Sequence, residues 1–156
     1  MRLEEIATEL QNIIELYSPL LLQVSEEQSK IPVAEGKWSR KQILGHLIDS
    51  ATNNHHRFIR AQLRNHIELP GYTQNDWIRL NAYEKKSWSD VVPFWKVYNE
   101  HLVLILSQIP DEVLHNTISL DGKPAMTLQF VAEDYVRHLK HHLEQMGLKY
   151  LPKSSG

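Results

Sequence analysis

Residues 135–146 read Tyr-Val-Arg-His-Leu-Lys-His-His-Leu-Glu-Gln-Met, and this stretch combines a helical core pattern with a pair of histidines. Its apolar positions, and those just before it, recur every three or four residues, as on the buried face of a helix. They are Val131, Tyr135, Leu139, Leu143 and Met146. His138 and His142 lie one turn apart at an edge of that face, so both imidazoles can reach one metal ion. The stretch predicts a core-facing helix that carries part of a metal site.

Three earlier stretches have the same helical periodicity. Helices are expected over residues 3–24, 39–63, 89–110 and 127–147. The second begins with a clear signal, because Ser39 is a good N-cap and Gln42 completes a capping box. The last ends at Gly147, a residue type that is common just after a helix.

Four amphipathic helices with one irregular crossover indicate an all-α protein, a four-helix bundle. Residues 115–124 contain Thr-Ile-Ser-Leu and an Asp-Gly pair, which favour a short extended or hairpin segment before the last helix. We expect residues 1–152 to form a single domain and residues 153–156 to form a flexible tail.

The composition excludes several classes of protein. The 156 residues include no cysteine, which rules out disulfides, thiolate metal sites and a cysteine nucleophile. The net charge is −2 with charges of both signs interspersed, so neither nucleic acid nor membrane is an expected partner. No stretch approaches the roughly 20 apolar residues of a membrane span. Acidic residues near the N-terminus do not resemble a signal peptide, and we expect a cytoplasmic protein.

The second expected helix supplies a partner for the histidine pair. His46 lies at the edge of its apolar face, as His138 and His142 do on the last helix. Three histidines on two packed helices would form a facial set that leaves coordination positions open, as catalytic metal sites require. Zinc or nickel are the expected metals, with iron or manganese as alternatives. The alternative interpretation is a set of hydrogen-bonded structural histidines, although two adjacent imidazoles at a buried edge would compete for partners.

Other histidines are expected to have ordinary roles. His101 lies next to the apolar stripe of its helix and is interpreted as a hydrogen-bonded structural residue. His55, His56 and His141 are expected to be solvated. No H-E-x-x-H or Glu-x-x-His motif occurs, so neither a zincin nor a di-iron bundle is indicated.

Two charged residues follow His46 on the same helix and are candidates for catalytic roles. Asp49, one turn later, could orient a metal ligand or a water molecule, or it could be a surface carboxylate. Arg57 could bind a carboxylate of a substrate, or it could form a salt bridge within the protein. Tyr72 and Trp77, in the segment after this helix, could form a wall of the pocket or simply pack down.

Two motifs resemble a known family. They are Trp38-Ser-Arg-Lys-Gln-Ile-Leu-Gly-His46-Leu-Ile-Asp49-Ser and, about 90 residues later, His138-x-x-His-His142. Both are similar to the DinB/YfiT-like superfamily, most closely to its YfiT branch of metal-dependent hydrolases, which includes bacillithiol S-transferases. The resemblance implies a four-helix bundle, often dimeric, with a divalent metal ion held by His46, His138 and His142. Gly45 departs from the family pattern, because relatives often have another histidine there.

The resemblance supports the site better than the reaction, so three functions stay open. The favoured one is transfer of a low-molecular-weight thiol to a small electrophile by a homodimeric enzyme, with the sulfur supplied by a cosubstrate because the chain has no cysteine. The second is hydrolysis of a small amide or ester by a metal-activated water molecule. The third is a non-catalytic, stress-related bundle whose metal is structural or absent.

Overall fold

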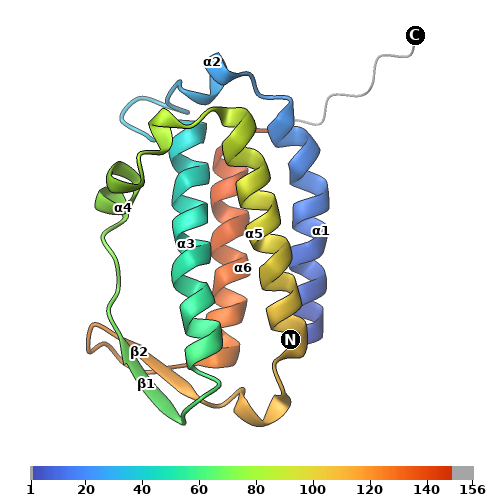
Figure 1. Ribbon diagram of the computed structural model, residues 1–156, viewed down its shortest axis with the longest axis vertical. Coiled ribbons are helices and arrows are strands. Elements are labelled where there is room, and N and C mark those ends of the chain that lie inside the picture. Colours follow the sequence, from blue (N-terminus) through green and yellow to red (C-terminus); the bar gives the residue numbers. More distant parts are fainter. Residues whose placement is uncertain (1, 149–156) are drawn as a thin grey trace.

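The computed structural model describes residues 2–148, and four long helices form a bundle, as the sequence predicts (Figure 1). They are α1 (Leu3–Leu22), α3 (Arg40–Arg60), α5 (Trp88–Gln108) and α6 (Leu128–Gln145). Helices α1 and α6 run upward in Figure 1, whereas α3 and α5 run downward. Helix α1 packs on α5 and α6, and α3 packs on the same two helices. The antiparallel pair α3 and α6 therefore brings the start of one helix beside the end of the other.

The helix boundaries follow from local capping. Ser39 and Gln42 form the expected capping box, with each side chain bonded to the backbone N–H of the other residue. The hydroxyl of Thr127 accepts a hydrogen bond from the backbone N–H of Phe130 at the start of α6. The ends of the first and second long helices lie two to three residues earlier than expected, at Leu22 and Arg60. Such differences are typical of frayed last turns.

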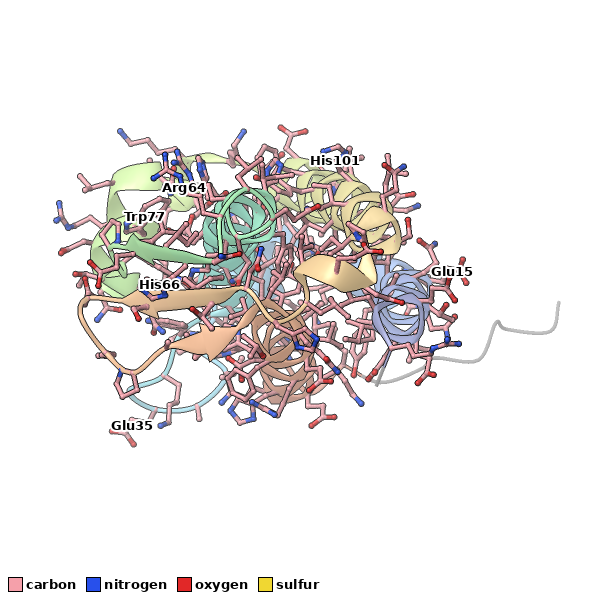
Figure 2. All side chains as sticks on the ribbon, turned by 90° about the horizontal axis from the view of Figure 1, so that it is seen from below. Glu15, Glu35, Arg64, His66, Trp77 and His101 are labelled. Carbon is pink, nitrogen blue, oxygen red and sulfur yellow. The ribbon has the colours of Figure 1, made fainter. Side chains whose placement is uncertain are left out.

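The connections contain short elements that periodicity alone does not reveal. They are α2 (Glu26–Ser29), β1 (His66–Leu69), α4 (Gln74–Asn81), β2 (Thr117–Leu120), β3 (Met126–Thr127) and the 3₁₀ turns Tyr83–Lys85 and Asp111–Val113. Strands β2 and β3 form the expected hairpin before the last helix. Strand β1 adds to it in parallel, which gives the order β1-β2-β3. Figure 2 shows the strands to one side of the bundle, with His66 at the start of β1.

The crossover from α3 to α5 changes the environment of α3. It runs along the outside of the bundle and packs α4 and the 3₁₀ turn at Tyr83 against α3. Every residue of α3 from Ile43 to Ala51 is consequently buried, including polar ones. This segment therefore lacks the solvent-exposed polar face of an ordinary surface helix.

None of the helices in residues 2–148 combines the length and the hydropathy of a membrane span.

A buried lysine ties three helices together at the α2 end of the bundle. Lys41 is only 2% exposed, and its Nζ donates hydrogen bonds to Glu26 Oε1 at 2.6 Å and to the carbonyl oxygen of Lys86 at 2.7 Å. The second oxygen of Glu26 accepts a hydrogen bond from the backbone N–H of Trp88 at 2.6 Å. Glu26 thus links α2 to the first turns of both α3 and α5, and these contacts hold the pKa of its carboxyl below the usual value.

Replacing this lysine should destabilise the fold. In Lys41→Met the chain keeps an apolar side chain but loses two hydrogen bonds, so we expect the free energy of unfolding in urea to fall by about 2 kcal/mol. Lys30→Met is the matched control, because the exposed Lys30 Nζ lies 3.8 Å from the same Glu26 oxygen. Exposed pairs contribute about 0–1 kcal/mol, so the control should stay close to the parent. Equal losses in both variants would contradict this role of Lys41.

Candidate metal centre

Three histidines from two helices converge inside the bundle. His46 comes from the early part of α3, and His138 and His142 come from the late part of α6. One ring nitrogen of each lies within 4.8 Å of the others, and no other such group of three His, Asp or Glu occurs in residues 2–148. His46 is fully buried, whereas His138 and His142 are partly buried. These are the three residues that the sequence selects as ligands.

The spacing of one nitrogen pair fits a shared ion. Nε2 of His46 and Nε2 of His138 lie 3.1 Å apart. Two nitrogens that bind one zinc ion at about 2.0–2.1 Å lie about 3.3 Å apart in a tetrahedron, or about 3.0 Å apart as neighbours in an octahedron. Nδ1 of His142 is held by Gln145 Oε1 at 2.9 Å, so its Nε2 is the nitrogen left for a ligand role. The donor set therefore fits a divalent ion without selecting one geometry.

The environment keeps the imidazoles neutral, as metal ligands must be. Burial, reinforced by the neighbouring His138 and His142, lowers the pKa of His46 to about 3. Burial and the nearby His142 lower the pKa of His138 to about 4. The pKa of His142 is also lowered, mainly by burial. At neutral pH all three side chains can offer a lone pair.

An aromatic side chain that helical periodicity does not predict covers the group. The ring of Trp38 lies 5.1 Å from that of His46 and is stacked on that of His142 at 6.4 Å, measured between ring centroids. Trp38 directly precedes the N-cap Ser39, so the start of α3 fixes its position. A tryptophan eight residues before a histidine has no periodic signal, which is why only the folded chain reveals this contact.

Asp49 is buried, not a surface carboxylate. It is 1% exposed, and its Oδ1 accepts hydrogen bonds from the hydroxyl of Tyr83 at 2.6 Å and from Nδ2 of Asn81 at 2.8 Å. Burial raises its pKa to about 6, although these two hydrogen bonds oppose the rise. Its Oδ2 has no hydrogen-bond partner among the described residues, and neither has Nδ1 of His46. Two unsatisfied polar atoms one turn apart indicate that a water molecule or ligand completes this region.

The packing of Tyr83 explains why position 45 is a glycine and not the histidine that relatives often have. A Cβ atom at this position would lie 2.8 Å from Cγ of the Tyr83 ring, closer than real side chains approach one another. The missing side chain lets Tyr83 pack against the α3 backbone and reach Asp49. In this chain the crossover segment therefore occupies the space that a histidine at position 45 would need.

A cavity of about 250 Å³ opens on the His138 side of the group. Arg57 lines it together with Tyr72 and side chains of α3, α6 and the strands. Trp77 does not line it but packs on Tyr72, with ring centroids 5.5 Å apart. A second hollow of about 500 Å³ lies on the other side, lined by His142, Trp38 and the loop before α3. The histidines therefore separate two spaces of different size.

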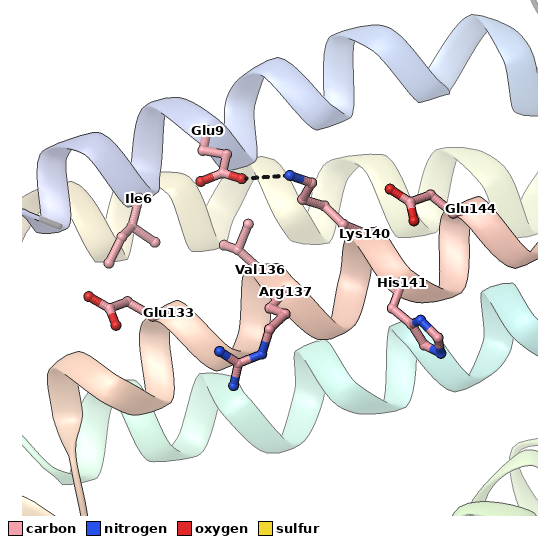
Figure 3. Close-up of a pocket in the computed structure, with 8 residues that line it drawn as sticks. All are labelled: Ile6, Glu9, Glu133, Val136, Arg137, Lys140, His141 and Glu144. Atoms are coloured by element: carbon pink, nitrogen blue, oxygen red, sulfur yellow. Dashed lines mark hydrogen bonds and ion pairs between the residues drawn. The ribbon is translucent and has the colours of Figure 1, made fainter.

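The remaining histidines lie elsewhere, and two differ in part from expectation. His55 is partly buried rather than fully solvated, and its Nδ1 is hydrogen bonded to the hydroxyl of Tyr98 at 2.8 Å. His101 is exposed on α5 (Figure 2), and its ring lies 5.5 Å from that of His55, measured between centroids. His141 lines a separate hollow of about 530 Å³ between α1 and α6, where Lys140 pairs with Glu9 at 3.2 Å (Figure 3). His141 also contacts the metal centre from outside, because its ring lies 5.4 Å from that of His142 and both rings are hydrogen bonded to the side chain of Gln145.

Comparisons with known proteins agree with this architecture. YfiT of Bacillus subtilis (strain 168), whose name describes it as a candidate metal-dependent hydrolase, is 22% identical over 142 residues. The alignment covers 90% of this chain and 76% of YfiT. The solved structure of YfiT, described as an unusual four-helix bundle, has a TM-score of 0.71 and covers 93% of this chain and 79% of its own.

A second solved structure with this fold belongs to a protein of different activity. The mycothiol-dependent maleylpyruvate isomerase has a TM-score of 0.77 at 14% identity, over 95% of this chain and 62% of that chain. At such low identity both structures show a shared fold and no more. The family assignment comes from the sequence, because a model of the DinB superfamily matches residues 9–146. The chain therefore belongs to the DinB superfamily.

Proposed function

We propose that this protein is a divalent-metal-dependent enzyme that transfers a low-molecular-weight thiol to a small electrophile. The observation that carries the proposal is the convergence of His46, His138 and His142, neutral and within 4.8 Å, at the boundary of two hollows. These three residues would hold the ion. When bound, it would act as a Lewis acid that stabilises the anionic form of a sulfur or oxygen ligand.

The protein's own residues provide for two substrates. The larger hollow beside His142 and Trp38 has room for a thiol cosubstrate, and the smaller cavity beside His138 has room for an electrophile. Trp38 covers the histidines and limits access of water to them. Asp49, fixed by Tyr83 and Asn81, places an unpartnered carboxylate oxygen one turn from His46, where it can hold a water molecule or accept a proton. A mycothiol-dependent enzyme with the same fold supports the thiol reaction.

Hydrolysis is the second candidate function. The name of YfiT supports it, since that relative is described as a metal-dependent hydrolase. A hydrolase needs one organic substrate and water, so one hollow would suffice for it. Zinc or nickel, a cytoplasmic location and a homodimeric state stay predictions from the sequence.

The proposed ligands can be tested by metal analysis of the untagged protein. We expect about one divalent ion per chain, and we expect His46→Ala and His142→Ala to lose it, because two remaining imidazoles bind weakly. His115→Ala is the matched control, since this exposed histidine lies outside the two helices that carry the proposed ligands. Full metal content in both ligand variants would disprove the three-histidine site.

Neutral histidines also predict how the stability of the metal-free protein depends on pH. Below pH 6.5 the unfolded chain protonates His46 while the folded chain, with a pKa of about 3, does not, so stability falls as the pH falls. From pH 7 to pH 5 this contribution amounts to about 2 kcal/mol. Asp49, whose pKa is raised to about 6, makes stability rise as the pH falls. This opposing effect is the same in the parent and in His46→Gln. Urea unfolding with a chelator should show that His46→Gln loses less stability than the parent over this range. An equal loss would contradict the lowered pKa.

The reaction can be tested with iodoacetamide as a generic electrophile and a panel of mycothiol, bacillithiol, coenzyme A and cysteine. In the S-alkylation a C–S bond forms, the C–I bond breaks, iodide leaves and the thiol proton passes to buffer. We expect the zinc- or nickel-loaded protein to accelerate iodide release with at least one thiol, and His46→Ala to reduce that rate by about 100-fold or more. Hydrolysis of p-nitrophenyl acetate without any thiol acceleration would instead favour the hydrolase.

A further inference from the structure

We propose that the cavity beside His138 binds the carboxylate group of a small organic acid, and that Arg57 is the residue that recognises it. The inference rests on the proposed function, because it assigns this cavity to the electrophilic substrate. It goes further by naming the chemical class of that substrate, which the three histidines do not indicate.

The first observation is that Arg57 forms no close ion pair with a described residue, although Asp134 lies near enough to attract its charge. Its side chain is partly buried, yet no carboxylate of residues 2–148 lies within 4.0 Å of its guanidinium. Its one hydrogen bond within this part of the chain is long, 3.4 Å from Nη1 to Asn54 Oδ1. A guanidinium offers five N–H donors in a planar fork that matches a carboxylate. The intraprotein salt bridge considered from the sequence is therefore not formed, and most of these donors are left for a ligand.

The cavity itself combines polar groups with an apolar wall. Ser50, Asn54 and Tyr72 supply the polar groups next to Arg57. The apolar lining consists of Leu120, Met126, Val131 and the ring of Tyr135. The hydroxyl of Tyr72 can act as a donor, since a tyrosine keeps its proton at neutral pH. This arrangement suits a ligand with one anionic end and a short apolar body.

The size of the cavity limits the part of a ligand that can be enclosed. Its volume of about 250 Å³ equals roughly eight water molecules at about 30 Å³ each. A short-chain organic acid fits this volume, whereas a nucleotide or a peptide does not. Because His138 lines the same cavity, an acid held by Arg57 would place its other end toward the three histidines.

One acidic side chain opposes an anion in this cavity. Asp134 also lines it, and it is the only carboxylate among the lining residues. Asp134 is half exposed and forms an ion pair with Arg137 on the next turn of α6, which reduces its repulsion of a bound carboxylate. Removing its charge should therefore strengthen binding, opposite to the effect of removing Arg57. Opposite changes in affinity in the two variants would show that the cavity recognises the ligand's charge, because a loss of packing would weaken binding in both.

The test uses butyrate and its neutral isostere butyramide, titrated into the chelator-treated and the zinc-loaded protein and followed by NMR. We expect butyrate to bind at least about tenfold more tightly than butyramide in both forms, because a charge-assisted pair is added. Arg57→Gln should weaken butyrate about tenfold or more without changing butyramide, and Asp134→Asn should strengthen butyrate. Arg60→Gln, on the exposed face of the same helix, is the matched control and should behave as the parent. Equal affinities for both probes, no butyrate binding, or no effect of Arg57→Gln in a variant that melts like the parent would overturn the proposal.

A kinetic comparison separates this inference from the proposed function. With iodoacetate and iodoacetamide as paired electrophiles, Arg57→Gln should raise KM for the acid about tenfold, leave kcat nearly unchanged and leave the amide unaffected. If the parent binds no metal and alkylates no thiol, the proposed function fails. The role of Arg57 is then still tested by butyrate binding to the chelator-treated protein. If turnover is normal and the acid and the amide respond alike to Arg57→Gln, the carboxylate inference alone fails.

Discussion

The antiparallel packing of α3 against α6 is the contact on which the rest of the site depends. It brings His46, near the start of α3, beside His138 and His142, near the end of α6. The same geometry brings Arg57, late in α3, to the cavity that Asp134 lines early in α6. One helix pair thus positions both the candidate metal ligands and the candidate anion site, and a shift of one turn, about 5.4 Å, would separate both sets.

Burying this many polar groups is costly unless each finds a partner. The crossover segment satisfies part of that requirement, since Tyr83 and Asn81 bind Asp49 from outside the bundle. The histidines are satisfied less well. Nε2 of His46 and Nε2 of His138 can share one proton in a hydrogen bond of 3.1 Å, but Nδ1 of His46 has no partner in the described part of the chain. A shared cation would bind lone pairs of all three rings at once. The close approach of three neutral rings is thus a physical reason for a ligand and is independent of any relative.

The fold alone does not identify the reaction. Proteins with this bundle include one described as a candidate metal-dependent hydrolase and a thiol-dependent isomerase, so function must be argued from the site. Here the distinguishing features are the two hollows on either side of the histidines and the unpaired Arg57 in the smaller one. Trp38, Tyr83 and Gly45 set the shape of this site, and all three act through contacts between segments distant in sequence.

The four long helices, the hairpin before α6 and the three histidines could be predicted from the sequence, because helical periodicity and capping are local properties that place side chains on a face. The states of Asp49 and Arg57 could not be predicted, since burial and ion pairing depend on which distant segment covers a helix. The folded chain was needed to show that the crossover buries Asp49, that Arg57 faces a cavity without a close ion pair to any described residue, and that Trp38 covers the histidines. Strand β1 and helix α4 also needed the folded chain, because four and eight residues are too few for a clear period and their positions come from packing on β2 and α3.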